Sequence, residues 1–115
     1  MILGTGIDII EIERIHKAIE RWGDGFLKHV FTPAEIKNAQ KFKFPYRHYA
    51  GRFAAKEAIF KAMGLPHLSW QDLTINNDTD GKPVCHYNNT SFKHRLLISI
   101  SHSRDYAVAS AIVEG

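Results

Sequence analysis

Glu57 is the residue of this sequence whose position most needs a chemical explanation. It lies in the segment 51–64, GRFAAKEAIFKAMG, four residues after Phe53 and three before Phe60 on the same helical stripe. Alanines and an isoleucine make most of the remaining surface of this helix apolar, so we expect the helix to be largely buried. A buried carboxylate is costly unless a cation or a metal compensates its charge. Glu57 therefore indicates either an ion pair or a metal site.

An ion pair is the simpler of these two interpretations. Lys61 follows Glu57 by four residues, a spacing that contributes only about 0.2–0.5 kcal/mol and occurs on many helices. Arg52 and Lys56 flank the same region at another four-residue spacing. These residues alone leave both interpretations open.

Three other features have side chains that could take part in chemistry, and each also has an ordinary structural explanation. Asp8 ends an opening strand, where it is either a helix N-cap or a metal ligand. His102 stands at the tip of the last predicted hairpin, where it is either a solvated turn residue or a ligand. The third feature is a basic helix face, either solvated or a docking surface, made of Arg14, Lys17 and Arg21.

The first half of the chain is predicted to hold one strand and three helices. Residues 1–7 read as a strand in which Gly4 and Gly6 allow a bend or a close approach. A helix over about 11–22 follows, ended by Gly23 and Gly25. Its apolar stripe is opposite the basic face and consists of Ile12, Ile15, Ile19 and Trp22.

The second and third helices have clear boundary signals. A capping box from Thr32 to Glu35, with proline at the first helical position, starts a helix that runs to about residue 42. Pro45 opens the long helix that carries Glu57, and Gly64 with Pro66 closes it.

The second half is predicted to be β structure. Strands over 72–76 and 82–87 are joined by a turn at 77–81, and strands over 96–101 and 106–113 form a second pair. Both faces of the last hairpin are apolar, so each needs a cover. We expect the helices to cover one face and a second subunit to cover the other.

Size and composition indicate one domain over residues 1–115. Fifteen Lys and Arg against twelve Asp and Glu give a net charge of +3, which suits phosphorylated or acidic partners without requiring nucleic acid. A single cysteine excludes an intramolecular disulfide, and no stretch approaches the ~18 apolar residues of a membrane span. We expect a soluble cytoplasmic protein.

Three motifs occur together: GTGID at 4–8, RFAAKEAIFKAMG at 52–64 and ISISH at 98–102. Together they resemble the 4'-phosphopantetheinyl transferases, most closely the short holo-[acyl-carrier-protein] synthase group, over nearly the whole chain. The resemblance implies an α+β domain in which an N-terminal strand and three helices pack on a mostly antiparallel sheet. It also implies a homotrimer with active sites between protomers. The implied reaction moves the 4'-phosphopantetheine arm of coenzyme A to a serine of apo acyl carrier protein, usually for fatty-acid biosynthesis, and releases adenosine 3',5'-bisphosphate.

The resemblance also assigns roles to individual residues. Asp8 and Glu57 correspond to Mg2+ ligands, and Glu57 is expected to take the serine proton directly or through a metal-bound water. Lys61 is expected to hold the pyrophosphate and stabilise the leaving phosphate. The expected coenzyme A-binding residues are Arg52, Lys56, Lys61 and His102. The basic face of Arg14, Lys17 and Arg21 becomes a docking surface for the acidic carrier protein.

Two other functions compete with this interpretation. A mildly basic, non-enzymatic nucleic-acid-binding module is compatible with the charge, but it leaves Glu57 unexplained and lacks one extended basic face with interleaved aromatics. A different Mg2+-dependent phosphate hydrolase would have to use the same two acids, because no GxxxxGK[ST] loop is present.

Overall fold

The structure is a computed structural model that describes residues 1–64, 68–88 and 94–115. These residues form two antiparallel sheets, one of three strands in the order β1-β5-β4 and one of two strands, β2-β3. The elements are β1 (Ile2–Glu11), α1 (Ile12–Trp22), α2 (Asp24–Val30), α3 (Pro33–Ala39), α4 (Tyr46–Met63), the 3-10 helix η1 (Trp70–Asp72), β2 (Leu73–Asn77), β3 (Pro83–Tyr87), β4 (Arg95–His102) and β5 (Tyr106–Glu114).

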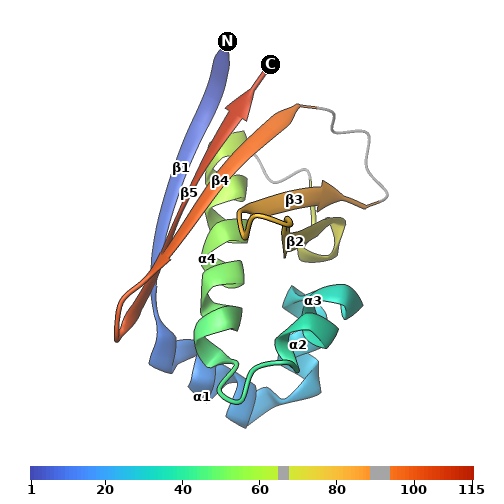
Figure 1. Cartoon of the computed structure of the whole chain (residues 1–115), viewed down its shortest axis with the longest axis vertical. Helices are drawn as coiled ribbons and strands as arrows, with labels where there is room; N and C mark the ends of the chain where they lie inside the picture. Colours follow the sequence, from blue (N-terminus) through green and yellow to red (C-terminus); the bar gives the residue numbers. More distant parts are fainter. Residues whose placement is uncertain (65–67, 89–93) are drawn as a thin grey trace.

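Helix α4 is the centre of the fold. It runs along one face of the three-stranded sheet, with the β2-β3 hairpin on its other side and α1 to α3 gathered near its N-terminal end (Figure 1). Ala54, Ala58 and Ile59 of this helix have no exposed surface and pack with Ile98 and Ala109 of the sheet. The small α+β architecture, with helices on a mostly antiparallel sheet, confirms the predicted fold class.

Two glycines let β1 lie directly on α4. A Cβ atom added to Gly4 would overlap the carbonyl oxygen of Ala62, and one added to Gly6 would overlap that of Ala58. The backbones of strand and helix therefore meet with no side chain between them. This confirms the predicted close approach and explains how β1 comes within reach of side chains on α4.

Four predicted boundaries or placements differ from the structure. Strand β1 continues past Ile7 to Glu11 because β5 supplies antiparallel partners along that whole length. Gly23 ends α1 with φ of 54°, but Gly25 lies inside α2, a short helix that the sequence reasoning missed. Helix α3 ends at Ala39 instead of about residue 42, although its capping box is present. Trp22, predicted to be apolar core, is 61% exposed because α1 ends there, beyond the elements that cover Ile15.

The other boundary predictions hold more closely. Pro45 is the N-cap of α4, and Gly64 ends that helix with φ of 83°, a conformation that favours glycine. The turn between β2 and β3 places Gly81 at φ of 84°. Pro66 lies outside the described residues.

The face of the three-stranded sheet that points away from α4 is apolar and uncovered. Its exposed side chains include Leu3, Ile7 and Ile9 of β1, which are 52%, 66% and 61% exposed. Alternate residues of β1 are more buried and face α4. No helix in the described part of the chain is both long and apolar enough to cross a membrane.

Candidate active site

The carboxylates of Asp8 and Glu57 come together where β1 crosses the C-terminal half of α4. Lys61 lies one turn beyond Glu57, and its Nζ donates to Asp8 Oδ1 at 3.0 Å and to the carbonyl oxygen of Ile7 at 3.1 Å. The Asp8 side chain is 15% exposed and the Lys61 side chain 53% exposed, so the cluster lies at the protein surface. We call Asp8, Glu57 and Lys61 the acidic cluster.

The charges in the acidic cluster act on one another. The pKa of Glu57 is raised, first by partial burial and second by the negative charge of Asp8, while Lys61 acts in the opposite direction. Two carboxylates that repel each other at a surface favour a bound cation. This arrangement goes beyond the simple helical pair, because Lys61 forms its ion pair with Asp8 on another element.

The position of Asp8 also decides between its two predicted roles. Asp8 lies inside β1, opposite Ala109 of β5, and α1 begins four residues later with Glu11 as its N-cap. The helix N-cap interpretation is therefore wrong. What remains for Asp8 is a side chain that faces α4 and meets a lysine and a second carboxylate.

The acidic cluster suits a magnesium ion. The described ranges hold no group of three or more His, Cys, Asp or Glu side chains that could bind a metal. Mg2+ does not need such a cage, because it keeps several waters and is commonly bound by one or two carboxylates together with substrate phosphates. Asp8 and Glu57 supply those two carboxylates at a surface that a phosphate can reach.

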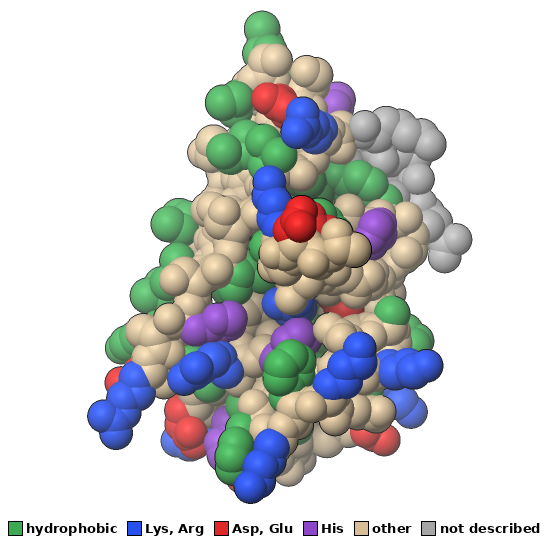
Figure 2. Space-filling model, viewed as in Figure 1, with side chains coloured by type: hydrophobic (Ala, Val, Ile, Leu, Met, Phe, Trp, Pro, Cys, Tyr) green, Lys and Arg blue, Asp and Glu red, His purple; other side chains and the backbone are tan. Residues whose placement is uncertain are grey.

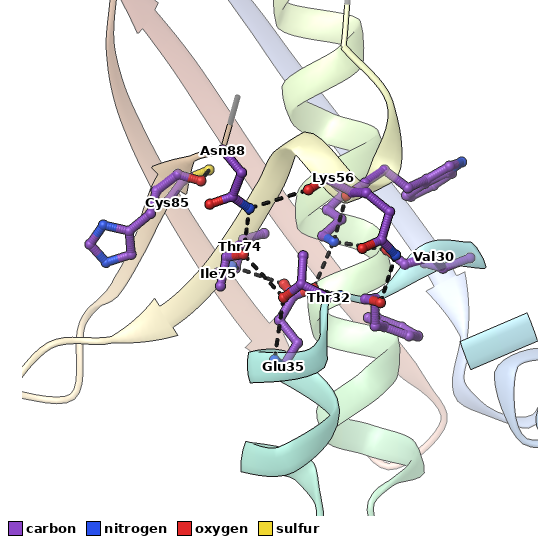
Figure 3. A network of polar contacts seen from close by, with 12 residues as sticks. Val30, Thr32, Glu35, Lys56, Thr74, Ile75, Cys85 and Asn88 are labelled. Atoms are coloured by element: carbon purple, nitrogen blue, oxygen red, sulfur yellow. Dashed lines mark hydrogen bonds and ion pairs between the residues drawn. The ribbon is translucent and has the colours of Figure 1, made fainter. Parts of the chain in front are cut away.

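Lys56 requires a correction. It was predicted to bind coenzyme A, but it has no exposed surface, and its Nζ donates to Glu35 Oε1 at 2.7 Å and to the carbonyl oxygens of Val30 and Trp70 at 2.8 and 2.9 Å. An ammonium group has three protons, so none is left for a ligand. Figure 3 shows Lys56 reaching from α4 to Glu35 on α3.

Glu35 completes this buried network, which the sequence reasoning missed. Its Oε1 also accepts from the backbone of Thr32, as the capping box predicts, and its Oε2 accepts from the backbone of Ile75 at 2.8 Å (Figure 3). The pKa of Lys56 is lowered, mainly by burial, while Glu35 opposes that shift. Lys56 and Glu35 thus tie α3, α4 and β2 together and have a structural role.

Arg52 and His102 lie at a separate cavity of about 680 Å³ beside the N-terminal half of α4. Histidines and cationic side chains gather around a hollow in the lower half of Figure 2. The residues that line the cavity are Ile12, His16, Phe42, Phe44, Tyr46, Arg47, His48, Arg52, Asn77, His102 and Arg104. We call it the cationic cavity.

Both predicted ligands in the cationic cavity are held by the fold. Arg52 is 5% exposed, and its Nη2 donates to Asn77 Oδ1 at 3.0 Å. The imidazole of His102 lies against Gly51, where an added Cβ would be 2.6 Å from its Nε2. The His102 residue is exposed at the cavity, and the partial burial of its ring, followed by the charge of Arg47, lowers its pKa. Of the five cationic or imidazole groups lining this cavity beyond His16, the sequence reasoning had named only these two.

The predicted site residues therefore fall into two groups within the chain. Asp8, Glu57 and Lys61 form one, and none of them lines the cationic cavity. Arg52 and Glu57 are five residues apart, which rotates them by about 140° around the helix axis. One chain thus presents the two groups on different sides of α4.

The predicted basic face is present on α1. Arg14, Lys17 and Arg21 are all exposed, and Ile15 on the opposite side is buried. The guanidinium carbon of Arg21 lies 4.9 Å from the centre of the exposed Trp22 ring. This face is open to a partner of opposite charge.

Comparison with known proteins places these features in a family. The sequence model of the 4'-phosphopantetheinyl transferase superfamily matches residues 4–111. The chain is 46% identical over 124 residues to a holo-[acyl-carrier-protein] synthase from Clostridium tetani, covering 100% of this chain and 98% of the relative. It is 40% identical to one from Koribacter versatilis, covering 99% of each.

Solved structures agree with the sequence comparison. The fold is similar to a holo-(acyl-carrier-protein) synthase from Bacillus anthracis in complex with CoA (3',5'-ADP), with a TM-score of 0.88, 40% identity, and 99% and 97% of the two chains covered. It is also similar to the synthase from Neisseria meningitidis, with a TM-score of 0.91, 30% identity and all of both chains covered.

Proposed function

The chain belongs to the 4'-phosphopantetheinyl transferase superfamily, and from this premise we propose that the acidic cluster is its catalytic centre. The protein is a transferase with the activity of a holo-[acyl-carrier-protein] synthase. In this proposal residues 1–115 form one transferase domain. Its substrates are coenzyme A and the serine hydroxyl of an apo acyl carrier protein, and its second product is adenosine 3',5'-bisphosphate.

Asp8 and Glu57 would hold Mg2+ in this proposal. The fit rests on the two facing carboxylates and on the raised pKa of Glu57, which reflects burial and the nearby negative charge. When bound, the ion would neutralise the pyrophosphate of coenzyme A and orient it for displacement.

Side chains of the protein are proposed to carry out the proton transfer and to stabilise the leaving group. The serine oxygen attacks the phosphorus that carries the pantetheine arm, and the bond to the bridging oxygen of the pyrophosphate breaks. Glu57 is the group proposed to accept the serine proton. The ammonium group of Lys61 stabilises the charge that develops on the leaving phosphate, and it lies 53% exposed where a substrate can reach it.

The cationic cavity is assigned to the coenzyme's phosphates. Arg52 and His102 are its predicted ligands, and Arg47 and Arg104 add positive charge. Because Arg52 and Glu57 point to different sides of α4, a complete site is made most simply from the acidic cluster of one protomer and the cationic cavity of another. The apolar outer face of the three-stranded sheet, with Ile7 and Ile9 exposed, supports the proposed homotrimer.

The carrier protein is proposed to dock on α1. Arg14, Lys17 and Arg21 form an exposed cationic face that would attract an acidic carrier and speed its encounter. A cytoplasmic location stays a prediction.

The observation that carries the proposed function is the apposition of Asp8 with Lys61 beside Glu57, in a chain similar over its full length to synthases. The test is to incubate the protein with Mg2+, coenzyme A and apo acyl carrier protein and to measure the intact mass of the carrier. We expect a gain of one phosphopantetheine arm, and none with a carrier whose acceptor serine is alanine. Consumption of coenzyme A without any carrier would indicate a hydrolase instead.

A further inference from the structure

His48 is a half-buried residue of the cationic cavity that has no role in the scheme above. It precedes Arg52 by four residues, so the two side chains share a face of α4. The Nε2 atom of His48 and the Nε atom of Arg52 are both buried, and neither has a hydrogen-bond partner among the residues that the structure describes. Buried polar atoms are rarely left unpaired, so two such atoms in one cavity call for a ligand.

The surroundings of His48 are electropositive and aromatic. The Phe42 ring stacks on the imidazole at 4.7 Å between centroids, and the Tyr49 ring meets its edge at 6.4 Å. The titratable groups that line the cavity or contact the imidazole come from α1, α4, β4 and the following turn. They are His16, Tyr46, Arg47, Tyr49, Arg52, His102 and Arg104. None of them carries negative charge at neutral pH.

This environment keeps the imidazole neutral while the cavity holds no anion. Burial, then Arg52, then His102 lower the pKa of His48 to about 4. A phosphate monoester in the same cavity would reverse the local balance of charge and favour the imidazolium form.

We propose that His48 binds the 3'-phosphate of the coenzyme through Nε2, beside Arg52, and takes up one proton from solvent as that phosphate enters. The inference rests on the proposed function, because it assumes that the cationic cavity receives the coenzyme. The proton adds a second positive charge next to the phosphate and strengthens the hydrogen bond. His48 is thus a residue that selects coenzyme A over its analogue without the 3'-phosphate.

Access to Nε2 requires one side chain to move. The atom has no exposed surface, and the ring stacked on it belongs to Phe42, which is 48% exposed and lies in the segment between α3 and α4. About half of the Phe42 surface is already exposed, so its displacement uncovers only the remaining half, and a charged hydrogen bond to the phosphate offsets that cost.

Calorimetric titration with two nucleotides tests this inference without any transfer reaction. Adenosine 3',5'-bisphosphate carries the 3'-phosphate, and adenosine 5'-monophosphate lacks it. Repeating each titration in two buffers of different ionisation enthalpy gives the number of protons taken up. The proteins are the wild type, His48→Gln, His48→Phe and the matched control His29→Gln, which changes an exposed histidine on α2.

We expect wild type and His29→Gln to take up protons with the bisphosphate and not with the monophosphate. His48→Gln should lose most of that uptake. His48→Phe should bind the bisphosphate roughly tenfold more weakly or worse, with the monophosphate unchanged.

Affinity for the bisphosphate should also fall more steeply with rising pH in wild type than in His48→Gln, because only wild type must acquire the proton. Because His102 and the nucleotide titrate in both proteins, their contributions cancel when the pH dependence of His48→Gln is subtracted from that of wild type.

Two results would overturn the inference. One is that wild type and His48→Gln take up the same number of protons and bind the bisphosphate with the same affinity. The other is that wild type takes up no proton with the bisphosphate, a result that can be obtained without any variant. Wild type that binds neither nucleotide removes the coenzyme site of the proposed function together with this inference. Arm transfer that proceeds while His48 fails these tests removes only the inference.

Discussion

At the scale of single residues, two lysines of α4 show how burial separates structure from chemistry. Lys56 and Lys61 are five residues apart, yet Lys56 has no exposed surface while the Lys61 side chain is 53% exposed. The Nζ of Lys56 donates all three of its protons, one to Glu35 and two to carbonyl oxygens. Lys61 meets Asp8 at the surface, where its charge is available to a substrate. The same side chain therefore supports the fold at one position and, in the proposed site, the reaction at the other.

Lys61→Met should reduce the rate of transfer and leave stability almost unchanged. Methionine keeps the apolar stem and removes one positioned donor, which costs about 10²–10³ in rate. The lost surface ion pair is worth less than about 1 kcal/mol in the free energy of unfolding. Steady-state kinetics with coenzyme A and carrier protein check the rate. A variant that shows only a raised KM for coenzyme A would instead assign Lys61 to ground-state binding.

Lys56→Met is the matched variant with the opposite outcome. It leaves the Glu35 carboxylate buried without its cation, so we expect unfolding to become easier by about 3–5 kcal/mol in urea denaturation. Folded Lys56→Met, measured well below its unfolding midpoint, should keep much of its affinity for coenzyme A. Normal stability together with lost coenzyme binding would return Lys56 to the predicted ligand set.

At the scale of elements, the contact between β1 and α4 makes the acidic cluster possible. Gly4 and Gly6 face the helix, and the absence of side chains there lets the strand sit against the carbonyl oxygens of Ala62 and Ala58. Asp8 is the next residue in that alternating series, so its carboxylate meets the helix in the following turn. A change in the glycines should therefore affect the site at a distance.

Gly6→Ala should weaken both stability and transfer. The new methyl group would overlap the carbonyl oxygen of Ala58, so β1 must move away and carry Asp8 with it. We expect the free energy of unfolding to fall by about 1–3 kcal/mol or more, as it does in other overpacked cores. Gly25→Ala in α2 is the control, because among the described residues no atom beyond its chain neighbours and its own helix backbone lies within 4 Å of the added Cβ. This substitution should raise stability by about 0.5–1 kcal/mol. Equal effects of the two substitutions in thermal unfolding would contradict the close-contact account.

The basic face of α1 gives a second prediction at this scale. Charge reversal at Arg14 and Arg21 should raise KM for the carrier protein while affinity for coenzyme A stays the same, because neither residue lines the cationic cavity. The defect should shrink as salt rises, because salt screens the attraction that wild type gains from these charges. At physiological salt the Debye length is already about 8–10 Å. Kinetics at several salt concentrations provide the check. Unchanged carrier kinetics would leave the face as an ordinary solvated surface.

Local signals predicted the long elements well and the long-range contacts poorly. The capping box of Thr32 and Glu35 and the glycine after α4 are local features, and both appear in the structure. The extension of β1 through Asp8 depends on pairing with β5, which lies a hundred residues away in sequence, so the strand was expected to stop too early. Helical spacing likewise could not predict that α3 buries Lys56 while Lys61 stays exposed.

At the scale of the whole molecule, one chain holds the two parts of the proposed site apart. The acidic cluster does not line the cavity that contains Arg52 and His102. The outer face of the sheet, with exposed Leu3, Ile7 and Ile9, offers the apolar surface that a stable assembly would bury. The motifs led to the predicted site residues, but they contained no information about the division of those residues between two sides of α4.

Mixing two inactive variants should restore activity if protomers share the site. Asp8→Asn removes a proposed metal ligand from the acidic cluster, and Arg52→Gln removes a proposed phosphate ligand from the cationic cavity. Trimers assembled from both variants would contain some sites in which both parts are intact. Co-refolded or co-expressed mixtures should therefore recover part of the transfer rate, whereas each variant alone should not. Mixed oligomers, verified by native mass spectrometry, that stay inactive would place the whole site within one protomer.

The central claim is that Asp8 and Glu57 together bind the metal on which transfer depends. The most direct measurement is the initial rate of arm addition to apo carrier protein, followed by intact mass, as Mg2+ is varied for wild type, Asp8→Asn and Glu57→Gln. The account predicts that chelation of Mg2+ stops the wild type and that each amide variant stays inactive at every Mg2+ concentration while remaining folded. Near-normal turnover by either variant at low Mg2+ would show that its residue is not a ligand and would contradict the claim.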